Sequence, residues 1–380
     1  MTSKINIFNK VTGLYTAIIT LFLSITFNLS ASEPQDDLVN PHPQELANAE
    51  HGETVKDPNK SVDITSVAFE HILDAHSWHF WGEGHDAVSV PLPVILYSNL
   101  KGLQVFMSSR FEHGHASYNG YSLHEEHIVS ENPAESVYDF SITKNVAQMF
   151  LSMILMLWLF ISIANSYKTQ GLTTAPKGKQ SFFEPLIVFV RDDLAKNNIG
   201  GKNYEKFVPY LLTVFFLILI NNVFGMLPIG ANLTGNIAFT LVMSVITLIV
   251  TNLNGNKHYW HHIFAPPAPK AIWIILIPIE IVGIFTKPFA LMIRLFANMT
   301  AGHIIIISLI GLIFIFKTTM ASFVAVPFAL FISVLECLVA VLQAYIFTML
   351  TALFIGTACA DHNEDGAYNE DDEAVAVKHH

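Results

Sequence analysis

The sequence predicts an all-α polytopic membrane protein of about five transmembrane helices, preceded by a small exported β-rich domain. The chain has 380 residues, of which 52% are hydrophobic and only 13% are charged, and its mean hydropathy is +0.45. Soluble proteins carry about 25% charged residues. Uncharged runs long enough to cross a bilayer also follow one another through the second half of the chain. We expect the long fourth and fifth segments to be tilted and packed as a pair.

Residues 1–32 are expected to be a secretory signal peptide. They begin with Lys4 and Lys10, continue through the apolar run VTGLYTAIITLFLSITF and end in small residues, which is the typical order of such a leader. An uncleaved anchor helix is the alternative, because the run is close to the shortest length that spans a bilayer. In both cases the region up to about residue 140 is exported. Residues 33–60 are rich in Pro, Glu and Asn and predict a disordered acidic linker.

Residues 61–140 are expected to form the small exported domain. The runs HSWHFW and VSVPLPVILYS alternate apolar residues and aromatics, which predicts two to four strands. Histidines are frequent here and suggest a metal site as one alternative, but their spacing is irregular and no cysteine accompanies them. We therefore favour solvated polar residues and predict neither metal nor cofactor. The histidines are His71, His76, His79, His85, His113, His115, His124 and His127.

The membrane domain is expected over residues 141–357, followed by an acidic cytoplasmic tail at 358–380. Five hydrophobic segments predict its spans, because about 20 apolar residues cross the hydrocarbon. The fourth segment is much longer than one perpendicular crossing, so it must tilt, re-enter or break. The segments are 146–166, 207–227, 236–253, 271–316 and 323–357.

Loop charge predicts the orientation. Residues 167–206 carry seven Lys and Arg residues, and positive loops stay in the cytoplasm. Five spans then place the exported domain in the periplasm of a bacterial inner membrane and the C-terminus in the cytoplasm.

The fourth segment contains several ionisable residues, although a charge in mid-bilayer costs at least ~2.5 kcal/mol. Glu280, Lys287 and Arg294 are spaced by seven residues, so they share one face if the helix is continuous. Asn298 joins this stripe, whereas His303 is expected on roughly the opposite side.

The fifth segment adds Glu336 and Gln343, again seven residues apart on one face. The guanidinium of Arg294 stays protonated in a low dielectric, so it can hold a neighbouring carboxylate ionised without itself passing a proton. His303 and Glu336 can titrate near neutral pH, as a proton relay requires. A purely structural salt bridge between Arg294 and Glu336 is the alternative.

Three runs resemble a known family. KPFALMIRLFANMTAGHIIII (287–307), LECLVAVLQAYIFTMLT (335–351) and EPLIVFVRDDLAKNNIGGKNYEKFVPYLLTVFFLILINNVFGMLP (184–228) look like subunit a of the F-type ATP synthase, the stationary half of its proton channel. The resemblance covers about residues 140–357. The long exported domain resembles the version found in the Bacteroidetes group.

The resemblance implies roles for the residues around Arg294. Arg294 matches the family's essential arginine, which faces the carboxylate of each passing c subunit, and Asn298 and Gln343 match its polar neighbours. His303 and Glu336 match the pair that lines the periplasmic half-channel. In many bacterial members the acid lies on the fourth segment and the histidine on the fifth, so this sequence exchanges them, which suggests a compensated relay.

Glu280 and Lys287 match residues associated with the cytoplasmic half-channel. The implied partners are the c-subunit ring, the b subunits of the peripheral stalk, the whole F1F0 complex and the lipid bilayer. No G-x-x-x-x-G-K-[ST] run is present and the chain has three arginines with no basic cluster, so neither a nucleotide site nor nucleic-acid binding is predicted. The chain is thus not expected to be an enzyme on its own, and the choice between H⁺ and Na⁺ stays open.

Two other functions remain to be weighed. A secondary transporter could bind an anionic solute at Arg294, but it would predict inverted repeats with broken helices in both halves. A membrane scaffold or sensor could use the exported domain to bind a ligand. The scaffold leaves the charges inside the membrane unexplained.

Overall fold

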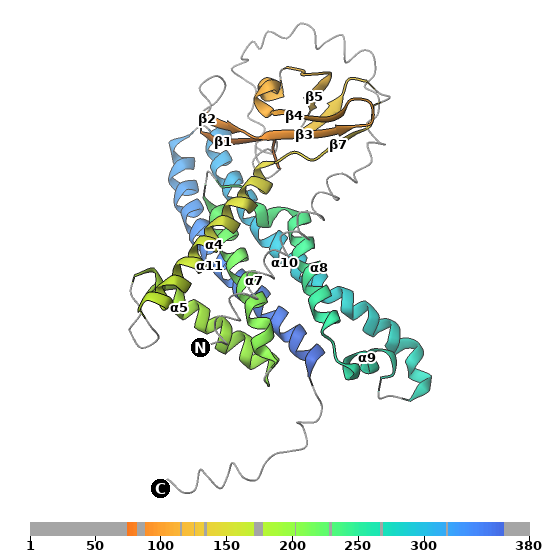
Figure 1. The fold of residues 1–380 in the computed structure, drawn as a ribbon. Coiled ribbons are helices and arrows are strands. Elements are labelled where there is room, and N and C mark those ends of the chain that lie inside the picture. The colour runs from red at the N-terminus through yellow and green to blue at the C-terminus, as the bar shows by residue number, and fades with distance from the viewer. Residues whose placement is uncertain are drawn as a thin grey trace.

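The computed structural model describes residues 74–81, 88–114, 116–124, 126–132, 135–170, 178–201, 203–227, 230–266, 269–316 and 318–360. The expected signal peptide, the acidic linker and residues 361–380 of the tail lie outside them. Figure 1 shows a β-rich unit at one end of a bundle of long helices. The expectation of a mostly helical chain with a small β-rich N-terminal region is confirmed at this level.

The β-rich unit contains more strands than expected. The described residues form seven short strands, so the prediction of two to four is wrong. Strands of three to six residues are too short for a period-two pattern to separate them reliably. They make three antiparallel sheets, with the orders β1-β2, β4-β3-β7 and β5-β6. Their bounds are β1 (Ser77–Trp81), β2 (Val88–Pro91), β3 (Pro93–Ser98), β4 (Gly102–Met107), β5 (Tyr121–His124), β6 (His127–Ser130) and β7 (Val137–Asp139).

A small core lies on one face of the three-stranded sheet. Val94 and Leu96 of β3 are fully buried against Phe111 and Tyr121. Phe111 belongs to the 3-10 helix η2 (Ser108–Gly114). The buried carboxylate of Glu135 accepts hydrogen bonds from the hydroxyls of Tyr121 and Ser98. Because this carboxylate is paired, it ties the loop before β7 to the core.

His76 is buried, which corrects the expectation of solvated histidines in this unit. It is only 5% exposed, and its Nε2 lies 2.9 Å from Oδ2 of Asp139. Its backbone amide donates to Oε2 of Glu126 at 2.9 Å. Burial lowers the pKa of His76, but the hydrogen bonds with Asp139 and Glu126 outweigh it and raise the pKa to about 9. His124 and His127 are exposed as expected, and no group of three metal-ligating side chains occurs among the described residues.

Helix α4 (Lys144–Gln170) begins directly beneath this unit. The amide of Asn145 donates to Oδ1 of Asp74 at 3.1 Å, and the amide of Lys144 donates to the carbonyl of Ala75 at 2.9 Å. The first amides of a helix have no partner within the helix. Residues some 70 positions upstream therefore cap α4 and attach it to the β-rich unit.

All five predicted spans are helical. Among the described residues, four helices are long and apolar enough to cross a membrane. The number rises to five if α8 (Ile237–Leu253) counts as one span with the short helix α9 (Lys257–Phe264), from which it is bent by 102°. The fourth segment is continuous, which leaves tilting rather than breaking as the way to fit its length. The helices are α4, α7 (Tyr204–Met226), α8 (Ile237–Leu253), α10 (Trp273–Phe316) and α11 (Thr319–Cys359).

The long loops contain helices that the sequence analysis did not anticipate. They are α5 (Lys179–Phe189), the π-helical η3 (Val190–Lys196), α6 (Asn197–Ile199), η4 (Leu233–Gly235), α9 and η5 (Lys270–Ile272).

Helix α7 lies at the centre of the bundle. Of the residues in its most apolar stretch 78% are buried, against 11% for α10 and 17% for α11. Polar side chains connect it to its neighbours: Nδ2 of Asn222 donates to the carbonyl of Ala340 on α11 at 2.9 Å, and Asn221 donates to Ser152 on α4 at 3.2 Å. Such bonds stabilise helix pairs in lipid, where no water competes. The bundle is thus fixed around α7, while α10 and α11 keep wide apolar faces uncovered.

Candidate functional site

The candidate residues lie on α10 and α11, which pack together in antiparallel fashion (Figure 1). Two polar contacts between predicted residues join the helices. Nδ2 of Asn298 donates to Oε1 of Gln343 at 2.9 Å, and Nε2 of His303 lies 3.9 Å from Oε1 of Glu336. The contacts step along the two helices in opposite directions, as an antiparallel pair requires. The structure therefore brings four of the seven predicted residues together in pairs.

The pair of His303 and Glu336 is largely buried. Glu336 is 8% exposed, and the side chain of His303 is 21% exposed. Within the described chain, Nε2 of His303 and Oε1 of Glu336 are both buried and have no hydrogen-bond partner. Two titratable groups held at this separation can exchange a proton across one water molecule, or directly once a small side-chain movement brings them within hydrogen-bond distance.

Gly302 makes room for the Glu336 carboxylate. A Cβ atom added at Gly302 would lie 2.6 Å from Oε1 of Glu336 and 3.0 Å from its Cδ, closer than non-bonded carbon and oxygen approach. Only glycine lets the carboxylate lie against the α10 backbone at this point. The sequence analysis did not single out Gly302, although its position directly before His303 could have drawn attention to it.

The prediction that His303 lies on the side of α10 opposite Asn298 is wrong in one respect: both residues reach the same neighbouring helix, α11. The two residues contact Gln343 and Glu336 respectively, and these lie seven apart on one face of α11. An antiparallel neighbour that crosses close to the α10 backbone is reached by long side chains from either flank. The close approach at Gly302 accounts for the difference.

Arg294 lies on α10 between these two contacts and the N-terminal end of the helix. Its side chain is half-buried, and the residues beside it, Ile293 and Ala297, are exposed. Among the described residues Glu336 is paired with His303 rather than with Arg294, so the alternative of a structural Arg294–Glu336 bridge is not what forms. Because Leu291 and Leu295 are buried, Arg294 lies at the edge of the uncovered side of the bundle, where a partner can reach the exposed part of its side chain.

Glu280 and Lys287 lie on the other side of Arg294. They are 14 and seven residues before it, or about 21 Å and 10 Å along a helix, whereas His303 is about 14 Å beyond it. Oε1 of Glu280 is 3.6 Å from Nδ1 of His262 on α9, and both side chains are partly exposed. Glu280 to His303 covers about 35 Å of helix, close to the ~30 Å thickness of the hydrocarbon.

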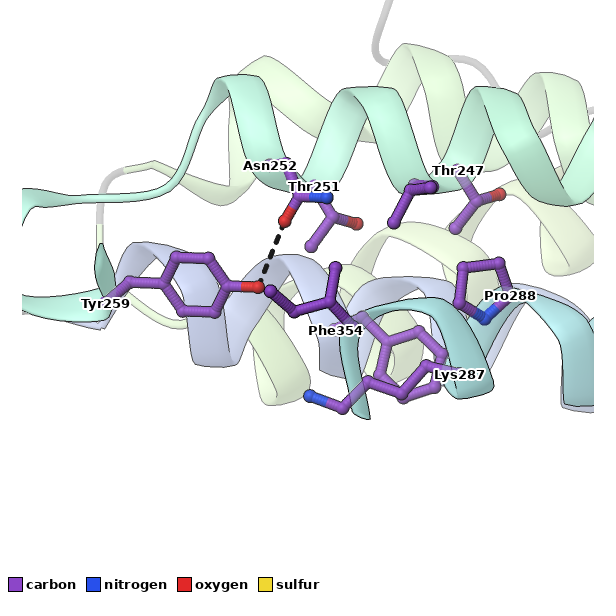
Figure 2. A pocket seen from close by; sticks show the side chains of 9 residues that line it. Thr247, Thr251, Asn252, Tyr259, Lys287, Pro288 and Phe354 are labelled. Atoms are coloured by element: carbon purple, nitrogen blue, oxygen red, sulfur yellow. Dashed lines mark hydrogen bonds between the residues drawn. The ribbon is translucent and has the colours of Figure 1, made fainter. Parts of the chain in front are cut away.

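Lys287 borders a pocket between α8, α9, α10 and α11 (Figure 2). Its Nζ lies 5.6 Å from the ring centre of Phe354. Polar groups line the opposite wall, where the hydroxyl of Tyr259 donates to Oδ1 of Asn252 at 3.0 Å, drawn as a dashed line in Figure 2. The sequence analysis missed Tyr259 and His262, because they lie between two of the predicted spans.

Comparison with known proteins decides the family. The family model described as ATP synthase A chain matches residues 146–356, which include both contact pairs, Arg294 and the pocket. The chain belongs to the ATP synthase A chain family. A second model, described only as a domain of unknown function, matches residues 67–149.

Curated relatives agree with membership of the ATP synthase A chain family. "ATP synthase subunit a 2" of Prosthecochloris aestuarii is 51% identical over 60% of this chain and 72% of the relative. "ATP synthase subunit a" of Chloroherpeton thalassium is 48% identical over 60% of this chain and 70% of the relative. "ATP synthase subunit a" of Anaeromyxobacter dehalogenans is 36% identical over 93% of this chain and 91% of the relative. Neither the solute-transporter nor the scaffold alternative is supported by these relatives.

Proposed function

We propose that this chain is the proton-translocating stator subunit of an F-type ATP synthase. It forms two half-channels against the rotating c-ring and couples proton flow to ATP synthesis elsewhere in the complex. Membership of the ATP synthase A chain family supports this function, as does the printed name of its relatives, ATP synthase subunit a. The chain itself is a membrane subunit and not the catalytic one.

One observation carries the proposal: polar groups lie at two separate levels of a single continuous helix, with Arg294 between them. The pair of His303 and Glu336 lies on one side of Arg294. Glu280 with His262 and the pocket at Lys287 lie on the other side. Two half-channels that never meet need this offset, because one continuous polar path would let protons cross without turning the ring.

The pair of His303 and Glu336 is proposed to deliver protons from the periplasm. Glu336 is buried next to an imidazole that can hold the same proton. Asn298 and Gln343 are hydrogen-bonded to each other. Asn298 lies between His303 and Arg294 on α10, and the pair is proposed to shape the surroundings of Arg294. A ring carboxylate protonated from this pair can then turn into the lipid without a net charge.

Glu280 and Lys287 are proposed to line the cytoplasmic exit. The field of Arg294 favours the ionised form of each returning ring carboxylate, so the proton leaves there. The b subunits and the F1 sector would complete the complex in a bacterial inner membrane. Its exported unit would lie in the periplasm and its C-terminus in the cytoplasm, as loop charge predicts.

The test is ATP-driven proton pumping by the purified complex in liposomes. Arg294→Ala should abolish pumping while the b and c subunits still co-purify, because the variant removes the fixed charge and leaves the α10–α11 contacts in place. Arg110→Ala is the matched control, since Arg110 lies in the exported unit beside the ring of Tyr118. Normal pumping by Arg294→Ala, or purification of the wild-type chain without c subunits, would contradict the proposal.

A further inference from the structure

One face of the β4-β3-β7 sheet is apolar and uncovered. In an antiparallel sheet with one face in water, the outward positions are normally polar. Here the outward positions are Tyr97 on β3, Leu103, Val105 and Met107 on β4, and Tyr138 on β7, and all five are exposed. Leu103 and Val105 are 64% and 63% exposed. We call these five residues the bare sheet face.

The strand register makes the bare sheet face continuous. Tyr97 pairs with Leu103 on one side and with Tyr138 on the other. Val105 and Met107 pair with Ile95 and Pro93 in the next rows. No charged residue occupies these outward positions of the three described strands. A contiguous apolar patch of this kind marks an interaction surface.

The bare sheet face is turned toward the membrane helices. The opposite face holds the core around Phe111 of η2 and Tyr121 of β5. In Figure 1, η2 and β5 lie on the side of the sheet that is remote from the helix bundle, so the bare sheet face looks toward the ends of the helices. The sheet extends sideways beyond α4 in this view.

The connection to α4 keeps the sheet close to the bilayer. Only residues 140–143 separate β7 from α4, which limits the distance from Asp139 to Lys144 to about 17 Å. Two of these residues are themselves bound to β3: the amide of Phe140 donates to the carbonyl of Ile95 at 2.8 Å, and that of Ile142 to the carbonyl of Pro93 at 3.0 Å. The headgroup layer is roughly 5 to 8 Å deep, so the sheet is held at its surface.

We propose that the bare sheet face lies on the lipid headgroups and upper acyl chains of the leaflet around the N-terminal end of α4. Tyrosine rings favour that level of a membrane, with the ring among apolar groups and the hydroxyl in the hydrated layer. The absence of outward charges on these strands fits lipid better than it fits a protein rim, which is normally polar. This surface would hold the exported unit parallel to the bilayer, and it does not depend on how protons pass α10 and α11.

Fluorescence quenching tests the proposal in the full chain within its purified complex. The complex is reconstituted into vesicles of phosphatidylethanolamine and phosphatidylglycerol, with part of the lipid carrying a nitroxide at the headgroup. Cys337→Ala and Cys359→Ser remove the native thiols. Leu103→Cys and, separately, Val105→Cys then carry an environment-sensitive dye. His124→Cys is the control, because His124 is exposed at the end of β5 on the far side of the sheet.

Dyes at Leu103 and Val105 should lose most of their fluorescence to the nitroxide lipid and little to aqueous iodide, and the dye at His124 should show the reverse. Iodide quenching at both sheet positions as strong as at His124 would overturn the proposal, because the face would then be in water. Protection from both quenchers would also overturn it, because another polypeptide would then cover the face. A photoreactive benzoylphenylalanine at Leu103 would identify that polypeptide as a second copy or another subunit.

Discussion

Nε2 of His303 and Oε1 of Glu336 are 3.9 Å apart on facing helices, and neither atom has a hydrogen-bond partner in the described part of the chain. An acid and an imidazole that face each other can trade places without changing the number of protons that the pair holds.

This relationship predicts how proton pumping responds when the acid and the imidazole at positions 303 and 336 are exchanged. His303→Glu and Glu336→His should each lower ATP-driven pumping in liposomes by about 10²-fold, the range typical of losing one acid–base group. The double variant His303→Glu with Glu336→His restores one acid and one imidazole and should recover roughly tenfold over either single variant. Co-purification of the c and b subunits checks assembly. A double variant no better than the two single variants would contradict the relay.

Gly302→Ala should impair pumping without unfolding the protein. The added Cβ would lie 2.6 Å from Oε1 of Glu336, so the flexible carboxylate must swing away from His303. Alanine itself favours a helix by about 0.5 to 1 kcal/mol over glycine, so abundance should not fall.

Gly283→Ala is the matched control for this glycine, since nothing lies within 4 Å of a Cβ built there on the same helix. Pumping rates and thermal melting of the two variants would be compared. Equal pumping by Gly302→Ala and Gly283→Ala would show that the position of the Glu336 carboxylate does not matter.

Glu280→Gln should reduce pumping less than Glu336→Gln does. The Glu280 side chain is 39% exposed, so water and His262 can take over part of its proton exchange, whereas the Glu336 side chain is 6% exposed. Each variant would be measured for pumping and for subunit co-purification, with Glu131→Gln in the β-rich unit as the control. A larger loss of pumping in Glu280→Gln than in Glu336→Gln would contradict the prediction that the buried Glu336 contributes more to proton transfer.

The β-rich unit should lose stability at alkaline pH. The pKa of His76 is raised from its ordinary 6.5 to about 9 by Asp139 and Glu126, against the effect of burial. Its contribution is fully present below pH 6.5 and is lost as the pH rises through about 9. The shift corresponds to a free energy of unfolding on the order of 3 kcal/mol.

Thermal unfolding of the full protein would be followed by tryptophan fluorescence between about pH 6 and pH 10. The melting transition of the β-rich unit should fall with rising pH in the wild type and stay nearly level in His76→Gln. His124→Gln, which changes an exposed histidine, should behave like the wild type. A pH-dependent transition that survives in His76→Gln would assign the effect to other groups.

The membrane helices could be predicted because each needs only a long run of apolar residues. Glu280, Lys287 and Arg294 share one helix face, as their seven-residue spacing predicts, because α10 is continuous. Which residue meets which across the helix pair could not. The bond between Asn298 and Gln343 and the pairing of His303 with Glu336 depend on the relative shift of two helices. That shift is set by packing at residues such as Gly302, and no periodicity along one helix encodes it.

The β-rich unit was harder to anticipate for a different reason. Its strands have three to six residues, too few for alternation to separate a strand from a loop. The burial of His76 depends on Glu126 and Asp139, which lie 50 and 63 residues away. The residues next to His76 in the sequence therefore do not indicate which side chains it will contact.

The cap that Asp74 supplies to Asn145 imposes an order on biosynthesis. In the proposed orientation, residue 74 crosses the membrane ahead of α4, so the acceptor is already on the far side when the N-terminal end of that helix forms. A precursor arrested before that crossing would leave the first amides of α4 without the acceptors that Asp74 and Ala75 supply.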